Sequence, residues 1–138
     1  MRKLAFVVAF FLAGFVLSAQ QNEDSYNMAR QIIYGENPIG VITRVNDNAL
    51  EGLSDYAMGM AGANERRLNE NDAWLLSVLC LIETNRRNAA STNEFLVYLQ
   101  ERSEWLDTQP LSGRTGRAAG WVQAYEILIR SRQLSVGK

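Results

Sequence analysis

The sequence contains no histidine and a single cysteine, Cys80. Without histidine, neither a Ser-His-Asp triad nor a Cys-His pair can form, and the commonest zinc ligand is missing. One cysteine permits no disulfide within the chain and no thiolate cage for a metal. We therefore predict no metal site and no cofactor. Because its neighbours are apolar, we interpret Cys80 as a small buried hydrophobe, with an exposed reactive thiol as the alternative.

The motifs that cradle phosphate groups or activate a serine are also absent. The chain has no GxSxG, no GxGxxG and no GK[ST] sequence. Carboxylates remain, and Glu70 with Asp72, or Glu101 with Glu104, are close enough in sequence to act as an acid and a base. Both pairs fall where solvated residues or helix caps are expected. We therefore predict no catalytic residues and a protein that is not an enzyme.

Lysine is scarce, and basic residues are not in excess. The whole chain has a net charge of −1, and removal of Arg2 and Lys3 with the first 19 residues leaves 12 bases against 15 acids, or −3. Nucleic-acid-binding proteins normally carry a basic excess on one face. We therefore expect no nucleic-acid partner.

A long uninterrupted apolar run occurs only at the start of the chain. Residues 1–3 are positively charged at Arg2 and Lys3, residues 4–17 are fourteen apolar residues, and residues 18–19 are small. This order is typical of a secretory signal peptide. We predict that residues 1–19 are a cleaved signal peptide and that the protein is exported, periplasmic or secreted.

The alternative is an anchor that is not cleaved. Cutting after residue 18 or 19 puts Val16 or Leu17 at the −3 position, which is not ideal for cleavage. Fourteen apolar residues, however, fall short of the roughly 20 that span a bilayer. A membrane is therefore an expected partner only if this segment is kept.

Residues 20–138 have the composition of one globular domain, with 47% hydrophobic and 21% charged residues over the whole chain. The stretch 73–82, AWLLSVLCLI, is apolar at nine of ten positions, with Ser77 as the interruption. We predict a buried helix there, with Asn71 or Asp72 at its N-cap, around which the other helices pack. Small residues at Gly52, Gly59 and Ala63 predict a close crossing of a preceding helix against it.

The remaining chain shows helical periods with end signals. A short N-terminal helix is expected before Gly35, and the capping-box sequence Ser91–Glu94 begins another. Expected caps near residues 48, 72, 91 and 115 suggest two helical hairpins. Residues 38–45 are either helix or strand, since Asn37-Pro38 favours a helix start but the β-branched residues favour a strand. We predict an all-α fold: an irregular bundle of about four to five helices, two hairpins plus the short N-terminal helix.

One loop has the composition of an anion-binding site. Ser112, Arg114, Thr115 and Arg117 alternate with glycines just before the last predicted helix, where free N–H groups and arginine forks can hold a carboxylate or phosphate. Trp105, at the edge of its apolar stripe, is a candidate for an exposed recognition patch. The alternative is a solvated loop capped by Thr115, with Trp105 at the edge of the core.

These observations give two functional hypotheses. The first is an exported, non-catalytic helical protein that binds another envelope or secreted protein as an adaptor, inhibitor or assembly factor. The second is a small envelope enzyme or anion-binding protein that uses carboxylates and the Arg114/Arg117 loop. A deep pocket lined by Glu101, Glu104, Arg114 and Arg117 would favour the second hypothesis, and an apolar patch near Trp105 would favour the first. Oligomeric state is not indicated by the sequence.

Overall fold

The computed structural model describes residues 23–64, 67–110 and 115–136, with side chains up to residue 131. The described part is all-α and contains no strand. Its elements are a helix over residues 23–34, α2 (Pro38–Ile42), α3 (Asp47–Gly62), α4 (Glu70–Asn88), α5 (Thr92–Asp107) and α6 (Gly116–Val136). The predicted signal peptide, residues 1–19, lies outside the described residues.

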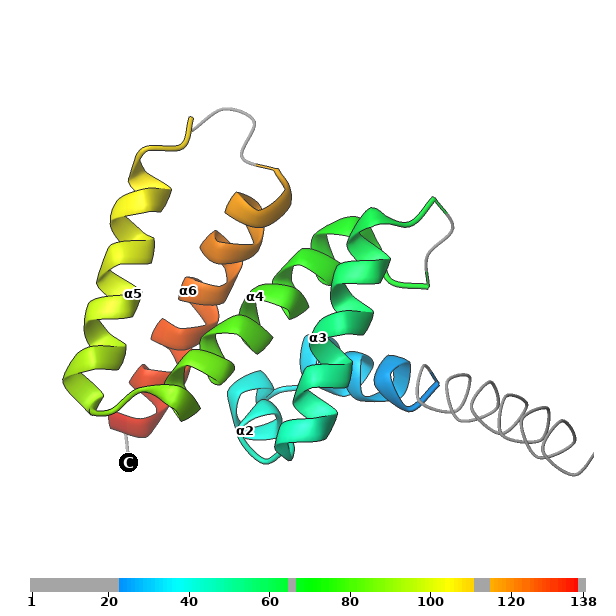
Figure 1. Cartoon of the computed structure of the whole chain (residues 1–138), viewed down its shortest axis with the longest axis horizontal. Coiled ribbons are helices and arrows are strands. Elements are labelled where there is room, and N and C mark those ends of the chain that lie inside the picture. The colour runs from blue at the N-terminus through cyan, green and yellow to red at the C-terminus, as the bar shows by residue number, and fades with distance from the viewer. Residues whose placement is uncertain (1–22, 65–66, 111–114, 137–138) are drawn as a thin grey trace, which may run out of the picture.

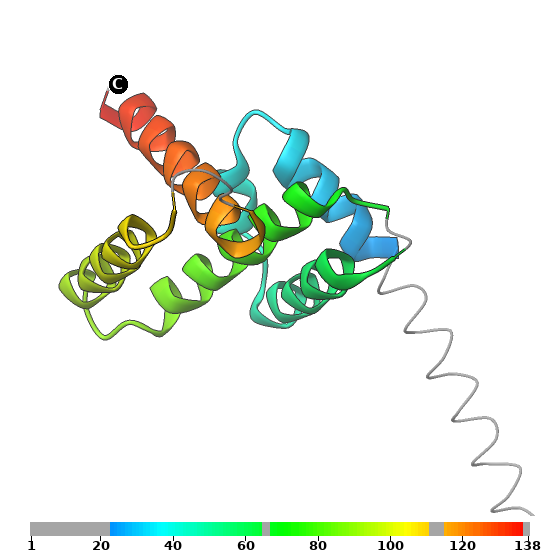
Figure 2. The same ribbon diagram turned by 90° about the horizontal axis from the view of Figure 1, so that it is seen from above.

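The central helix is α4, as the sequence predicts. Most of the stretch 73–82 is buried, and even Ser77 and Glu83 are covered. α3 and α6 lie along two sides of α4 and make the most extensive packing contacts of the described helices (Figures 1 and 2). A helix that is apolar around most of its circumference is stable only when it is covered in this way.

The described chain has six helices, more than the four to five expected. The additional helix is α2, which also settles the choice between helix and strand for residues 38–45. Asn37 is its N-cap and accepts a hydrogen bond from the Gly40 N–H at 3.0 Å, with Pro38 in the first turn. The cap and proline therefore outweigh the β-branched composition, because they satisfy the first turn of a helix.

Side-chain caps set the other helix starts. Asn46 accepts from Ala49 N–H and begins α3, two residues before the cap expected near residue 48. The cap of α4 is Asn69, which accepts from Asp72 N–H at 2.8 Å, so the predicted cap at Asn71 or Asp72 was wrong by two to three residues. Asn69 takes this role because its backbone is extended, as an N-cap requires, whereas the following residues are already helical.

The capping box of α5 is present with one change. Glu94 N–H donates to Ser91 Oγ at 3.1 Å, as predicted. The Glu94 carboxylate, however, accepts from Ala90 N–H at 2.6 Å rather than from the residue-91 N–H. The side chain therefore ties down the residue before the cap as well as the start of the helix.

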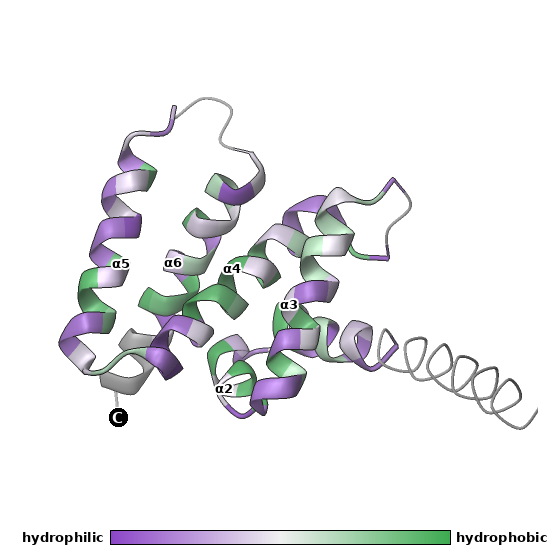
Figure 3. Ribbon diagram, viewed as in Figure 1, coloured by the Kyte–Doolittle hydropathy of each residue, from purple (hydrophilic) through white to green (hydrophobic). Residues whose placement is uncertain are grey.

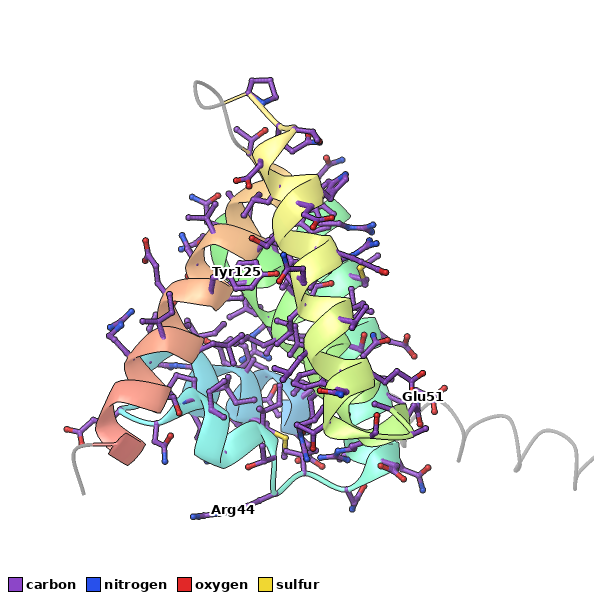
Figure 4. All side chains as sticks on the ribbon, turned by 90° about the vertical axis from the view of Figure 1, so that its left-hand side faces the viewer. Arg44, Glu51 and Tyr125 are labelled. Atoms are coloured by element: carbon purple, nitrogen blue, oxygen red, sulfur yellow. The ribbon has the colours of Figure 1, made fainter. Side chains whose placement is uncertain are left out.

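The second predicted hairpin is less closely packed than the first. α5 and α6 run side by side in Figure 1, yet α6 packs far more extensively on α4 than on α5. Trp121 and Ala124 of α6 are fully buried. Tyr125 joins the two helices, because its hydroxyl donates to the Leu99 carbonyl at 2.6 Å; Figure 4 shows it between them.

α3 packs on α4, as the small residues of α3 predict, but Gly59 does not lie at their contact. A methyl group at Gly59 would meet nothing within 4 Å, so the part of the prediction that concerns this glycine was wrong. A methyl group at Gly120 of α6 would lie 2.8 Å from the Trp74 carbonyl oxygen of α4. Glycine is required at position 120 because the two backbones nearly touch there.

Candidate functional site

The predicted loop site is only partly described. Ser112 and Arg114 lie outside the described residues. Thr115 is exposed and immediately precedes α6, and Arg117 is exposed in the first turn of that helix. Trp105 is half-buried near the end of α5. In Figure 1 the end of α5 and the start of α6 lie at the same end of the molecule. The prediction of an anion site on this loop therefore stays a prediction.

The aromatic residue that Arg117 contacts belongs to α4. The Arg117 guanidinium lies 5.8 Å from the centre of a Trp74 ring. Gly116 has a φ of +60°, a backbone conformation that favours glycine, and a methyl group at this position would lie 3.7 Å from the Trp74 indole nitrogen. The start of α6 therefore lies beside Trp74, a residue of the predicted central helix.

The helix α5 exposes apolar side chains that the sequence analysis missed. Residues 95–99, FLVYL, are five consecutive apolar residues, more than one helical turn of about 3.6, so they cannot all face the core. Leu96 is 52% exposed and Val97 is 56% exposed, whereas Leu106 is the buried residue of the helix. The sequence signal for this exposure was the uninterrupted apolar run itself, since an amphipathic helix normally has polar residues on its outward face.

A hollow of about 470 Å³ lies between α5 and the last turns of α4. We call it the α4–α5 hollow; it is lined by Asn85, Asn88, Ala89, Glu94, Phe95, Val97, Tyr98 and Glu101. Burial raises the pKa of Tyr98, and its hydroxyl has no hydrogen-bond partner among the described residues. The hollow thus combines an apolar wall with two carboxylates.

The four carboxylates predicted as possible acid–base pairs have different surroundings. Glu70 is exposed in the first turn of α4. Asp72 accepts from the Tyr34 hydroxyl at 2.7 Å and from the Asn69 amide at 3.0 Å, and it belongs to the first turn of α4. Glu101 and Glu104 are exposed on α5. Asp72 is therefore held in a helix-start network, whereas the two α5 carboxylates face solvent.

A buried ionic cluster on α4 fixes the connection between α2 and α3. Glu83 is only 3% exposed and is paired with Arg86, whose guanidinium forms two-point contacts with the carboxylate. That hydrogen bond raises the pKa of Arg86. Arg87 lies 3.6 Å from Glu83, pairs with Asp47 at 2.8 Å, and donates to the Val45 carbonyl. Because the charges of Glu83, Arg86 and Arg87 are paired within the cluster, we assign it a structural role.

A second arginine cluster holds the helix over residues 23–34. The Arg67 guanidinium stacks 3.6 Å from the Tyr26 ring centre and pairs with Glu23 at 2.6 Å. The Arg67 charge and hydrogen bond lower the pKa of Glu23. This cluster joins the first described helix to the α3–α4 connection.

The interpretation of Cys80 is confirmed. The thiol is fully buried in α4, and burial raises its pKa to about 12. A thiol with such a pKa is protonated at neutral pH and is a poor nucleophile.

The described residues contain no group of three or more acidic, cysteine or histidine side chains placed to hold a metal ion. None of the described helices is both long and apolar enough to cross a membrane.

The comparisons with known proteins give no relative. No protein-family model matches the chain, and searches of curated proteins and of solved structures find no match. Function is therefore inferred from the surface of the molecule itself.

Proposed function

We propose that this is an exported, non-catalytic protein that binds another protein of the cell envelope or of the secreted fraction, as an adaptor, inhibitor or assembly factor. The observation that supports this proposal is the exposure of Leu96 and Val97 on α5. Contiguous apolar side chains on a protein surface are typical of interaction sites, because contact with a partner removes them from water. Export is proposed from the leader sequence of residues 1–19.

The position of α5 in the fold adds to this support. It stands at one edge of the molecule, with α6 beside it and its other side open (Figures 1 and 4). Trp105, predicted as a recognition residue, lies on the same helix. A partner can therefore reach the exposed side of α5 without displacing any described helix.

Site-specific photo-crosslinking in the producing cells tests the proposal. The full chain, leader included, carries a C-terminal tag and a benzophenone amino acid in place of Val97. A matched control carries the same group in place of Glu51, an exposed residue of α3. We expect a discrete adduct with one exported protein from position 97 and none from position 51. We also expect the purified protein to have the mass of a chain that lacks residues 1–19.

Two results would contradict the proposal. The same adducts from both positions would indicate random collisions, and the absence of any adduct from position 97 at native expression would remove the proposed partner. Retention of the chain in the cytoplasm would contradict export.

A further inference from the structure

The outer side of α5 is acidic as well as apolar. The helix carries four acidic residues and one basic residue, a net charge of −3. At about 100° per residue, Val97, Glu101 and Glu104 fall on the same outward side, with Leu96 at its edge. All four are exposed. We call this surface, Leu96, Val97, Glu101 and Glu104, the α5 outer face.

The acidic residues of α5 have no cationic partner in the described part of the chain. The ion pairs between described residues involve Glu23, Asp47 and Glu83, none of them on α5. The basic residue of the helix, Arg102, is turned toward Tyr98, with its guanidinium carbon 5.8 Å from the ring centre and its Nε buried. It therefore does not neutralise the outer face.

Two of these carboxylates are also placed where the helix disfavours them. Glu104 and Asp107 stand in the last turn of α5, which contains no basic residue. The C-terminal end of a helix carries a partial negative charge, so carboxylates there are destabilising and a nearby cation is favourable. An external cation would satisfy both the side chains and the helix end.

The α4–α5 hollow offers a cation a separate place to bind, beside residues 94–101 of α5. Glu94 and Glu101 lie two helical turns apart and line it together with Val97, Phe95 and the amide of Asn88. One Glu94 oxygen is used by the Ala90 N–H, which leaves Glu101 as the freer carboxylate. The long side chains of arginine and lysine pack an apolar stem and present a charged head, which matches a wall of this mixed character.

We infer that the α5 outer face binds a basic amphipathic segment of the partner protein, with an arginine or lysine entering the α4–α5 hollow beside Glu101 and an apolar side chain covering Leu96 and Val97. This inference rests on the proposed function and names the chemistry of its partner. A second copy of the chain is not the occupant, because a two-fold contact would place the same acidic surface against itself.

The test uses the mature protein and a defined probe. The probe is a fluorescent 18-residue helical peptide with leucine along one side and arginine beside it; its twin has every arginine replaced by glutamine. The variants are Glu101→Gln/Glu104→Gln, Val97→Ser, and the matched control Glu51→Gln/Asp55→Asn, which removes two exposed charges from α3. Circular dichroism establishes that each variant is folded.

We expect the arginine peptide to bind more tightly than its twin and to weaken as salt is added. Loss of the two α5 carboxylates should weaken binding by about 5- to 30-fold, the sum of charge pairs each worth up to about 1 kcal/mol. Val97→Ser should weaken it by roughly 3- to 10-fold through lost apolar contact. The control pair should change binding by less than about twofold, since it lies outside the α5 outer face.

Three outcomes of the experiments on the purified protein would overturn the inference. They are equal weakening by the α5 and control double variants, equal affinity for the glutamine twin, and a concentration-dependent dimer that Val97→Ser abolishes. A crosslinked partner from position 97 that still binds the Glu101→Gln/Glu104→Gln variant would also overturn it, while leaving the proposed function in place. Absence of that crosslinked partner contradicts the function itself.

Discussion

At the scale of single residues, Arg87 is the side chain that joins most parts of the fold. It is 19% exposed and links Glu83 of its own helix to Asp47 at the start of α3. It also donates to the carbonyl of Ile42, the last residue of α2, and to the carbonyl of Val45, which follows that helix. The Ile42 carbonyl accepts a second hydrogen bond, from the Val45 N–H at 3.3 Å. A single guanidinium thus satisfies the end of one helix and the start of the next, for which its five donors are suited.

We therefore predict that Arg87→Met lowers the free energy of unfolding by about 2–4 kcal/mol, because the substitution removes the donor to the partly buried Val45 carbonyl and to Asp47. The matched control is Arg44→Met, since Arg44 points away from the molecule in Figure 4 and is exposed. The control should change stability by less than about 0.5 kcal/mol. Urea denaturation measures both, and equal effects would contradict the assigned role of Arg87.

At the scale of elements, the crossing of α4 and α6 is set by Gly120. The 2.8 Å separation between a methyl group at Gly120 and the Trp74 carbonyl oxygen is too short for any real contact, and the obstructing atom is backbone that cannot rotate away. Trp121, next in the chain, is buried at the same crossing. Gly120 thus allows the backbones of α4 and α6 to approach closely, directly beside the large side chain of Trp121.

Two matched alanine substitutions test this assignment. Gly120→Ala should destabilise the protein by about 1–3 kcal/mol, because the helices must move apart. Gly59→Ala, at a helical glycine with open space around it, should instead stabilise by up to about 1 kcal/mol through helix propensity alone. Thermal unfolding of the two variants separates the effects. Similar shifts of the same sign would mean that the crossing is not close at Gly120.

At the scale of the whole molecule, α5 is the least integrated of the long helices. Figure 3 shows a hydrophobic stretch after the hydrophilic first turn of α5 and a mostly hydrophilic second half, in contrast to the largely hydrophobic middle of α4. Leu106 is its fully covered side chain, whereas nine residues of α4 are buried. Regions with few buried apolar contacts open locally at low free energy.

We predict that amide hydrogens of α5 exchange faster than those of α4 by roughly tenfold or more in protection factor. The core helix opens only when most of the molecule unfolds, whereas α5 packs on α4 and α6 much less extensively than α3 and α6 pack on α4. One hydrogen bond, from the Tyr125 hydroxyl, also joins α5 to α6. Native-state hydrogen exchange followed by mass spectrometry measures both helices in one sample. Equal protection across α4 and α5 would show that α5 belongs to the core unit.

The local signals in the sequence determined the helices and most of their limits. Asn37-Pro38, Asn46 and Ser91 each mark a helix start, because a side-chain oxygen next to unpaired N–H groups acts over only a few residues. The apolar run over residues 73–82 likewise predicts the central helix, since its burial follows from its own composition. The Asn69 cap was missed because Asn69, Asn71 and Asp72 are chemically equivalent in sequence.

Only the tertiary structure decided which helices pair and which surfaces remain open. Gly59 and Gly120 are both glycines within helical segments, and the sequence does not distinguish them. Gly59 faces open space, whereas Gly120 faces the α4 backbone. The apolar run of residues 95–99 similarly requires at least one exposed apolar side chain without indicating which one. The packing of α5 on α4 and α6 leaves Leu96 and Val97 exposed. Such features depend on contacts between residues far apart in the chain, which helix periodicity and end signals do not encode.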